Sequence, residues 1–191
     1  MTELPEGVSL VNAVGGGDLA IEVSLEELEK DLDIFLTRYE PESYPALYTQ
    51  FEEDSPKVSL FRTGSYHIAG ASSVEEVWDT RAGFLNALDD LGIPVSELDD
   101  DFAIRNLICV ANTELDLNLN ALAIGLGLEN VEYEPEQFPG LVYRSPDIVP
   151  VLLIFASGKI VITGANDFES ISSAYEHIRK ELNHLMNSTS E

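Results

Sequence analysis

The feature that most constrains this fold is a duplication within the chain. The segment Tyr39-Glu40-Pro41-Glu42 returns as Tyr133-Glu134-Pro135-Glu136, a shift of 94 residues. The same shift relates Asn12 to Asn106, Pro45 to Pro139, Leu47 to Leu141, Phe61 to Phe155, Gly64 to Gly158, and Gly70-Ala71 to Gly164-Ala165. A constant offset without gaps over such a length predicts two copies of one structural unit.

The repeat therefore sets the expected domain organisation. We expect a first repeat at residues 6–94, an acidic link at 95–101, a second repeat at 102–186 and a short tail at 187–191. A chain of 191 residues is long enough for a packed core, and a hydrophobic content of 45% is typical of a globular protein.

Within this plan, short strands and amphipathic helices alternate. Residues 132–165 read as three short strands joined by tight turns. The runs Val151–Phe155 and Ile160–Thr163 are apolar at nearly every position, which predicts that both faces of these strands are removed from water. We expect helices to begin at Ser24, Ser73, Asn118 and Asp167. The apolar face of the first is expected to extend through Phe35 and Leu36.

The charge of the chain is unusual for a globular protein. Asp and Glu number 35 against 10 Lys and Arg, a formal net charge of −25. Such a balance ordinarily argues against nucleic acid, whose binding depends on neutralising phosphates. An acidic, lysine-poor surface is also typical of proteins that work in molar salt. There the Debye length falls to roughly 3 Å, and repulsion from phosphates is screened. The composition therefore indicates a halophilic host and leaves DNA binding open.

No catalytic, cofactor or metal site is expected. The residues offer no nucleophile and base pair, and His67, His177 and His184 do not form a metal-binding pattern, so we expect solvated or helix-end histidines. Cys109 is the only cysteine, which excludes an internal disulfide and predicts a buried structural thiol. With no apolar run of about 18 residues and no signal peptide, we expect a cytoplasmic, nucleoid-associated protein without a membrane anchor.

Three motifs of the second repeat carry a resemblance to a known family. Phe138-Pro139-Gly140-Leu141-Val142-Tyr143-Arg144, Leu153-Ile154-Phe155-Ala156-Ser157-Gly158-Lys159 and Thr163-Gly164-Ala165 look like the C-terminal repeat of the TATA-box-binding protein family. The resemblance implies an α+β saddle, built from two βαββββα repeats with a curved antiparallel sheet beneath four helices. It also implies a transcription initiation factor without a cofactor. Its partners would be the minor groove of AT-rich double-stranded DNA, transcription factor B and RNA polymerase.

Carried over residue by residue, the resemblance also suggests a DNA-binding surface. It implies that Phe138 and Phe155 wedge into a base step, that Asn106 and Thr163 bond to base edges, and that Arg144 and Lys159 reach phosphates. Strand parity places Val161 on the same face as Phe155. In the first repeat the corresponding DNA-binding residues are Asn12, Tyr44 and Phe61. The alternative is that these aromatic residues fill an ordinary hydrophobic core. It is disfavoured because Arg144 and Lys159 are expected on the same face as the two phenylalanines.

The first repeat departs from this pattern. It has Gln50 in place of Arg144, Ser59 in place of Leu153, Ser65 in place of Lys159, His67 in place of Val161, and Ala69 in place of Thr163. A rival hypothesis follows, in which the chain is a paralogue that has lost TATA binding and acts through protein partners. The turn residues Glu134, Glu136 and Gln137 resemble the edge that transcription factor B grips in the family, although a plain acidic turn explains them equally.

Overall fold

The computed structural model describes residues 4–93 and 101–188, and both repeats follow the same order of elements. The first repeat consists of β1 (Val8–Asp18), α1 (Leu25–Asp31), β2 (Leu36–Tyr39), β3 (Ala46–Gln50), β4 (Lys57–Phe61), β5 (Ser65–Ala71) and α2 (Val74–Asp90). The second consists of β6 (Ala103–Asn112), α3 (Leu119–Gly125), the 3-10 helix η1 (Leu128–Asn130), β7 (Val131–Glu132), β8 (Leu141–Tyr143), β9 (Val151–Ile154), β10 (Lys159–Ala165) and α4 (Phe168–Ser188).

The offset found in the sequence holds in the structure. A shift of 94 residues carries α1 onto α3 and β5 onto β10, residue for residue. The α+β class and the βαββββα plan of each repeat are thereby confirmed. The predicted domain limits remain predictions. The acidic link lies outside the described residues except for Asp101, and most of the tail lies outside them as well.

Contacts within the chain define two compact units, which divide the first strand of each repeat. One unit is Asn12–Arg105, with the strand order β2-β3-β4-β5-β1. The other combines Met1–Val11 with Asn106–Glu191 and has the order β6-β10-β9-β8-β7. The registers printed for strand pairs within each unit are antiparallel. Each unit is therefore an antiparallel sheet with its own helices.

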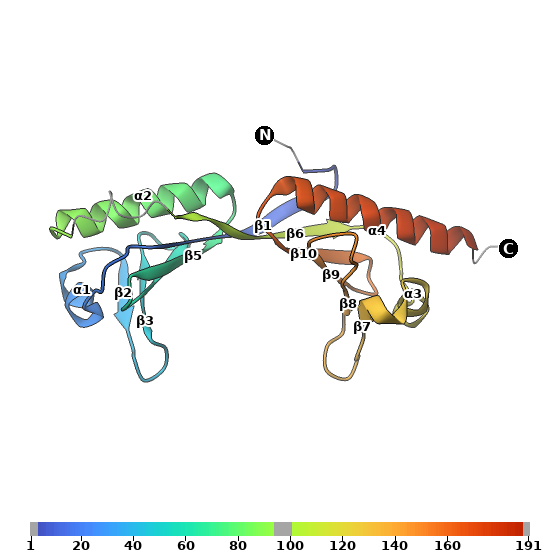
Figure 1. Ribbon diagram of the computed structural model, residues 1–191, viewed down its shortest axis with the longest axis horizontal. Coiled ribbons are helices and arrows are strands. Elements are labelled where there is room, and N and C mark those ends of the chain that lie inside the picture. Colours follow the sequence, from blue (N-terminus) through green and yellow to red (C-terminus); the bar gives the residue numbers. More distant parts are fainter. Residues whose placement is uncertain (1–3, 94–100, 189–191) are drawn as a thin grey trace. The chain divides into compact units, whose positions relative to one another are not determined.

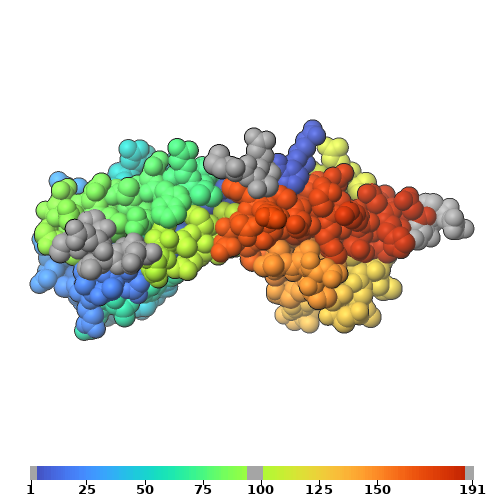
Figure 2. All heavy atoms as spheres, turned by 45° about the horizontal axis from the view of Figure 1, so that its top comes forward, coloured from blue at the N-terminus to red at the C-terminus, as the bar shows by residue number. Residues whose placement is uncertain are grey.

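In each unit a long helix covers one face of the sheet (Figure 1). In the first repeat α2 packs on β5, and a Cβ atom added to Gly15 of β1 would lie 2.6 Å from the Val77 side chain of α2. In the second repeat α4 packs on β10, and the Tyr143 hydroxyl of β8 lies 2.9 Å from Nε2 of His177 on α4. These contacts identify the helix-covered face of each sheet. In Figure 2 the atoms of α4, coloured orange-red to red, run along the outside of the second unit.

The strands of the second repeat alternate in burial, which corrects one prediction. Leu152, Ile154, Ile160 and Ile162 are fully buried under α4 and its neighbours. Val151, Leu153 and Val161 between them are only half-buried. The helices thus cover one face of these strands, and the expectation that both faces are removed from water is wrong for the chain by itself. The apolar character of the other face remains to be explained by something the chain binds.

The first helix is shorter than its apolar pattern predicts. It ends at Asp31, Leu32 already has an extended backbone (ψ 111°), and Leu36 begins β2. Phe35 is 60% exposed and does not continue the helix face. The run from Ile34 to Thr37 is rich in residues that favour strands, and pairing of β2 with β3 outcompetes another helical turn. Ser24 precedes this helix as predicted, but its side chain makes no cap hydrogen bond.

All four predicted helix starts are confirmed, and three of them have a side-chain cap. The Ser73 hydroxyl accepts from the Glu76 N–H (3.0 Å), and the Asn118 side chain accepts from the Ala121 N–H (3.1 Å). The Asp167 carboxylate accepts from the Ser170 N–H (2.7 Å) and from its hydroxyl. These bonds hold the pKa of Asp167 below its usual value, because they stabilise the charged form.

Two glycines at equivalent turns show why the duplication preserves certain residues. Gly64 between β4 and β5 has φ +93°, and Gly158 between β9 and β10 has φ +80°. A side chain at either position would be strained, and it would also collide with the backbone carbonyl of Ile21 or of Leu115, respectively. Ile21 and Leu115 are themselves 94 residues apart, so the whole close approach is duplicated.

No helix among the described residues has the length and apolar character needed to cross a bilayer.

Candidate nucleic-acid interface

The sheet face opposite the long helix of each unit is here called its open face. Strand parity assigns residues to it, since neighbours along a strand point to opposite faces. Tyr143 contacts α4, so Val142 and Arg144 belong to the open face of the second repeat. Gly15 faces α2 and pairs with Ile68, so Gly16 and His67 belong to the open face of the first repeat.

The open face of the second repeat carries a pair of phenylalanines. The ring centroids of Phe138 and Phe155 are 5.8 Å apart, and the rings meet edge to face. A Cβ atom at Gly140 would lie 2.7 Å from the Phe138 ring and 3.0 Å from the Phe155 ring. Gly140 therefore provides the space in which both rings lie. The structure brings together the two residues that the resemblance identified as wedges, and 37% of Phe138 is exposed to solvent.

Asn106 and Thr163 meet on the same face. The Asn106 amide oxygen accepts from the Gly164 N–H (2.8 Å), and its amide nitrogen donates to the Thr163 hydroxyl (3.2 Å). The backbone bond fixes which way the amide points and occupies its oxygen. One N–H of the amide and one lone pair of the Thr163 hydroxyl then remain for a ligand.

Two exposed cations flank the apolar part of this face. Lys159 begins β10, where it pairs with Asn112. Arg144 directly follows β8 and lies at the other end of the face, next to the pair that Thr163 forms with Val151. Both side chains are exposed. Between them lie Val142, Leu153 and Val161 in adjacent register. An apolar strip with a cation at each end suits a ligand that is apolar or flat in the middle and anionic at its edges.

The first repeat presents more aromatic rings than the second. Tyr44 and Phe61, the equivalents of Phe138 and Phe155, have centroids 6.0 Å apart. Tyr48 stacks on Tyr44 at 5.3 Å, and His67 meets the edge of Phe61 at 5.9 Å. Burial, and secondarily the neighbouring Tyr44, raises the pKa of the Tyr48 phenol, so the group stays neutral at ordinary pH. Four rings thus occupy positions that hold two rings and two valines in the second repeat.

The asparagine bond of the second repeat is also duplicated. The Asn12 amide oxygen accepts from the Gly70 N–H at 2.9 Å, as Asn106 does from Gly164. Ala69 stands where Thr163 would support the amide nitrogen, so this part of the first-repeat face has one hydroxyl fewer. Both asparagines are held by the same backbone geometry, and only their surroundings differ.

Gln50, the equivalent of Arg144, does not serve as a polar group of the open face. It is buried and donates its amide to the Ser55 carbonyl (2.8 Å), which ties down the turn between β3 and β4. The first repeat therefore lacks a cation at the position equivalent to Arg144, as the sequence indicated.

Sequence reasoning missed two cations of the first-repeat face. Lys57 is exposed and occupies the position of Val151, as the offset and strand parity together could have indicated. Arg105 is exposed and donates from Nε to the Gly16 carbonyl (3.1 Å). No sequence pattern pointed to Arg105, because its contact with Gly16 joins residues 89 positions apart in the chain. Arg105 also pairs with the Asp101 carboxylate at 3.6 Å, so Lys57 is the cation that leaves this face less depleted of positive charge than the aligned pairs suggested.

The predicted partner-binding turn is exposed and folded on itself. The Glu134 carbonyl accepts from the N–H groups of Gln137 and Phe138 (both 2.9 Å), and the Gln137 amide bonds to the Glu134 carboxylate. In the first repeat the equivalent Glu40 pairs with Arg38 at 2.7 Å. The second repeat has Glu132 at the position of Arg38, so its turn is the more acidic one.

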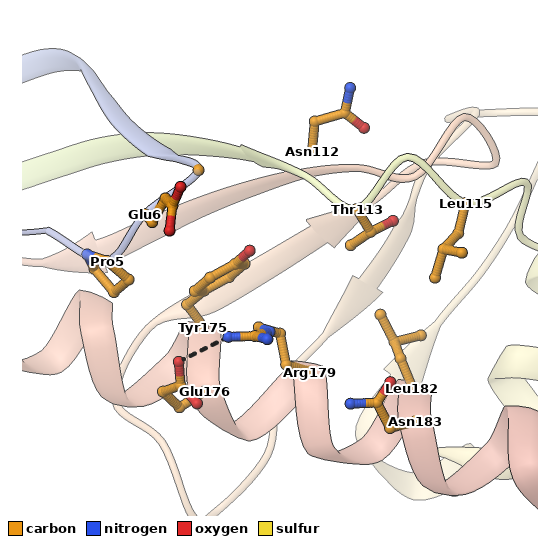
Figure 3. A pocket seen from close by; sticks show the side chains of 11 residues that line it. Pro5, Glu6, Asn112, Thr113, Leu115, Tyr175, Glu176, Arg179, Leu182 and Asn183 are labelled. Carbon is orange, nitrogen blue, oxygen red and sulfur yellow. Dashed lines mark hydrogen bonds and ion pairs between the residues drawn. The ribbon is translucent and has the colours of Figure 1, made fainter.

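A cavity of about 580 Å³ lies on the helix side of the second unit (Figure 3). It is lined by the N-terminal segment around Pro5, the end of β6 and the α4 side chains Tyr175 and Arg179. Arg179 lies over the Tyr175 ring and pairs with Glu176 at 3.2 Å. None of the predicted site residues lines this cavity, so it is separate from the open face.

Two further predictions concerned His177 and Cys109. The expectation of a solvated or helix-end His177 is wrong, because its ring stacks on Tyr143 and joins α4 to β8. The expectation for Cys109 is confirmed, because the thiol is free and buried, and burial raises its pKa to about 11.

Comparison with known proteins gives a consistent picture. The family model "Transcription factor TFIID (or TATA-binding protein, TBP)" matches twice, over residues 7–91 and 101–185. TATA-box-binding protein C of Halobacterium salinarum is 46% identical over 94% of this chain and 99% of its own length. The TATA-box-binding protein of Thermoplasma volcanium is 40% identical over 93% and 95%. The solved structure of Methanococcus jannaschii TBP matches with a TM-score of 0.75 and 36% identity, covering 96% of this chain and 99% of that one.

Proposed function

This chain belongs to the TATA-binding protein family, a family of transcription factors and not of enzymes, and on that basis we propose a mode of promoter binding. We propose that it binds and bends AT-rich DNA through the minor groove, using the open faces of both repeats. The observation that carries the proposal is the aromatic pair at equivalent positions of each open face, Phe138 with Phe155 and Tyr44 with Phe61.

The aromatic pairs supply the bending. Partly exposed rings at the end of an open face can enter a base step, unstack it and kink the duplex toward the major groove. Gly140 leaves the Phe138 and Phe155 rings room side by side, so both can enter one step together. Tyr44 places a hydroxyl where Phe138 has none, which makes its insertion between bases less favourable. We therefore assign the stronger wedge to the second repeat.

The asparagines supply contacts to base edges. In the minor groove an A·T pair presents only acceptors, the adenine N3 and the thymine O2. The amide oxygens of Asn12 and Asn106 are occupied by backbone N–H groups, which turns the amide nitrogens toward the ligand as donors. A donor fixed in this way matches an A·T pair in either orientation. This arrangement supports binding to AT-rich DNA without strong discrimination between A·T and T·A.

The net charge of −25 fits this mechanism at high salt. With a Debye length of roughly 3 Å at 1 M salt, acidic side chains away from the groove repel phosphates only weakly. Apolar wedging and deformation of the DNA keep their strength under those conditions. Relatives from Halobacterium salinarum and Haloferax volcanii, both halophilic archaea, support such a setting. We propose that the protein acts in the cytoplasm, on the nucleoid.

The turn that contains Glu134, Glu136 and Gln137 is our candidate surface for transcription factor B, which would in turn recruit RNA polymerase. The turn is exposed and held rigid by its own hydrogen bonds. Unlike its first-repeat equivalent it has no arginine partner for its carboxylates, because Glu132 replaces Arg38. An unneutralised acidic turn suits a partner with a basic docking surface.

Two binding measurements test the proposal. Fluorescence anisotropy at about 2 M KCl, where screening is nearly complete, should give tight binding to an AT-rich promoter duplex and much weaker binding to a GC-rich duplex. Addition of transcription factor B should produce a ternary complex that Glu134→Lys/Glu136→Lys weakens, whereas the matched first-repeat change Glu42→Lys should leave it intact. Binding to transcription factor B without any binding to DNA would favour the rival interaction paralogue instead.

A further inference from the structure

The two open faces differ most along one line of residues that crosses all their strands. In the second repeat the register aligns Val142, Leu153, Val161 and Val110 across β8, β9, β10 and β6. At the shift of 94 residues, the first repeat aligns Tyr48, Ser59, His67 and Gly16 across β3, β4, β5 and β1. We call the first line the aliphatic row and the second the polar row. An entire row has changed its chemistry while its backbone register has stayed the same.

The polar row is accessible, and Gly16 shapes it. His67 is exposed, and Ser59 and Tyr48 are half-buried. A Cβ atom at Gly16 would lie 3.1 Å from Nδ1 of His67 and 3.2 Å from Cγ of Arg105, both of which would have to move. The glycine thus gives His67 and Arg105 room on the open face. In the second repeat Val110 fills the equivalent space with its own side chain.

The two rows differ in how well they match the hydrogen-bonding groups that base pairs present in the minor groove. An A·T pair presents only acceptors there, whereas a G·C pair adds the amino donor of guanine. Against the aliphatic row that amino group loses its water and finds no acceptor, an unfavourable situation for a buried donor. Against the polar row it meets the Ser59 hydroxyl, the Tyr48 hydroxyl and an imidazole nitrogen of His67, each of which can accept a hydrogen bond.

We propose that the first repeat accepts a G·C pair beneath the polar row, whereas the aliphatic row restricts the second repeat to A·T pairs. Ser59 and His67 are the specificity-determining residues, and the recognised DNA is a site with one strictly A·T half and one half that tolerates guanine. This inference rests on the proposed DNA-binding function and names the sequence class of its two half-sites.

The test adds or removes only the amino group. Replacing single adenines of an AT-rich duplex by 2,6-diaminopurine adds a minor-groove amino group and keeps the pairing with thymine. Replacing guanine by inosine in a G·C variant removes that group again. For the wild-type chain, anisotropy at about 2 M KCl should show a loss of about tenfold or more at positions in one half, as for a mismatched pair. Positions in the other half should change affinity by less than about threefold, and inosine should restore what guanine loses.

Exchanging side chains between the two rows shows which half of the DNA site each repeat contacts. Ser59→Leu/His67→Val gives the first repeat an aliphatic row, so the tolerant half should acquire the tenfold penalty. The matched Leu153→Ser/Val161→His should relax the strict half. The single change His67→Val, at an exposed side chain that also meets the edge of the Phe61 ring, provides a second variant if either double variant unfolds. A cleavage reagent attached to Glu42→Cys, selective because Cys109 is buried, reports which half lies at the first repeat.

The outcomes separate this inference from the proposed function. Equal penalties in both halves, with one orientation confirmed by cleavage, would overturn the inference and leave DNA binding standing. A difference between the halves that neither Ser59→Leu/His67→Val nor His67→Val changes would overturn it as well. Failure to bind any duplex would overturn the proposed function, and the inference with it.

Discussion

The open faces of the two repeats share a backbone and differ in the side chains that would touch bases. Asn12 and Asn106 accept from equivalent glycine N–H groups at 2.9 and 2.8 Å. The aromatic pairs lie at equivalent positions, 6.0 and 5.8 Å apart. Between these fixed points an aliphatic row in one repeat is a polar row in the other. The comparison teaches that the duplication kept the asparagine bonds and the aromatic pairs and changed the row between them, which we propose reads the bases.

The covered faces differ in a second way. In the first repeat Phe102 packs above Gly15, and a Cβ atom at Gly15 would lie 2.5 Å from that ring. In the second repeat the equivalent of Gly15 is the buried Cys109, and the equivalent of Phe102 is Val8. Where one copy has a glycine and a phenylalanine, the other copy thus has a cysteine and a valine at the equivalent positions. The cores are filled by different pairs on one plan.

The largest effect should come from the wedges. Phe155→Ala should lower affinity for an AT-rich duplex by about a hundredfold or more and abolish most bending, because it removes one ring of the complete phenylalanine pair. Phe61→Ala should have an intermediate effect. Tyr44→Ala should lower affinity by much less, since its hydroxyl already makes insertion unfavourable. Anisotropy and gel mobility on one duplex at high salt measure all three. Equal losses at Tyr44 and Phe155 would contradict the inequality of the repeats.

The next effect concerns the first-repeat core. Gly15→Ala should destabilise the fold by about 1–3 kcal/mol, because the new methyl group overlaps the Phe102 ring and Val77. The same change at Gly83, inside α2, meets only an ordinary contact with Phe51 at 3.9 Å. Gly83→Ala should therefore stabilise by roughly 0.5–1 kcal/mol, through helix propensity. Urea unfolding in constant KCl compares the two, and the same sign for both would refute this account of the packing.

A smaller effect is expected from the cations of the open faces. Lys57→Gln and Arg144→Gln should each lower DNA affinity by less than about threefold at 2 M KCl and by more at low salt, because phosphate contacts are screened. Lys180→Gln, on the helix side, serves as the control and should change nothing at either salt concentration. If Lys57→Gln behaves like Lys180→Gln at low salt, Lys57 does not belong to the interface.

The smallest expected effect is a difference in pH dependence between the N-termini of α2 and α4. Ser73 and Asp167 are equivalent caps, but only Asp167 titrates. Because its pKa is lowered in the fold, its stabilisation is complete above the usual carboxyl value of about 4 and is lost as the pH falls through the lowered value. On acidification, the protection factors of amides at the start of α4, which compare each exchange rate with its unfolded value at the same pH, should fall before those at the start of α2. Asp167→Ser should abolish the difference.

Much of the molecule could be predicted because two simple regularities apply to it. The offset of 94 residues located the second copy of each element, and strand parity placed Phe155 and Val161 opposite the buried Ile160 and Ile162. The same two rules would also have identified Lys57, which the sequence analysis did not name. They were insufficient where a long-range pairing decides the outcome. The end of α1 at Asp31 depends on pairing of β2 with β3, which no local pattern reveals.

The remaining site residues depend on close approaches between segments distant in sequence. Arg105 lies against the Gly16 backbone on the open face, where the missing side chain of the glycine leaves room for both Arg105 and His67. His177 became structural because Tyr143, 34 residues away, presents a hydroxyl to it. Neither contact has a signature in spacing or composition, since both depend on the three-dimensional placement of a strand against a helix or a neighbouring strand.

The most direct test of the account is the bend of a doubly labelled AT-rich duplex, measured by energy transfer as KCl is raised from about 0.2 to 3 M, a range that spans strong and weak screening. We predict that saturating protein increases the transfer efficiency and that affinity stays flat or rises with salt, because wedging and not phosphate neutralisation drives binding. Binding that falls steeply with salt, or that leaves the duplex straight, would contradict the claim that the two open faces grip and kink the minor groove.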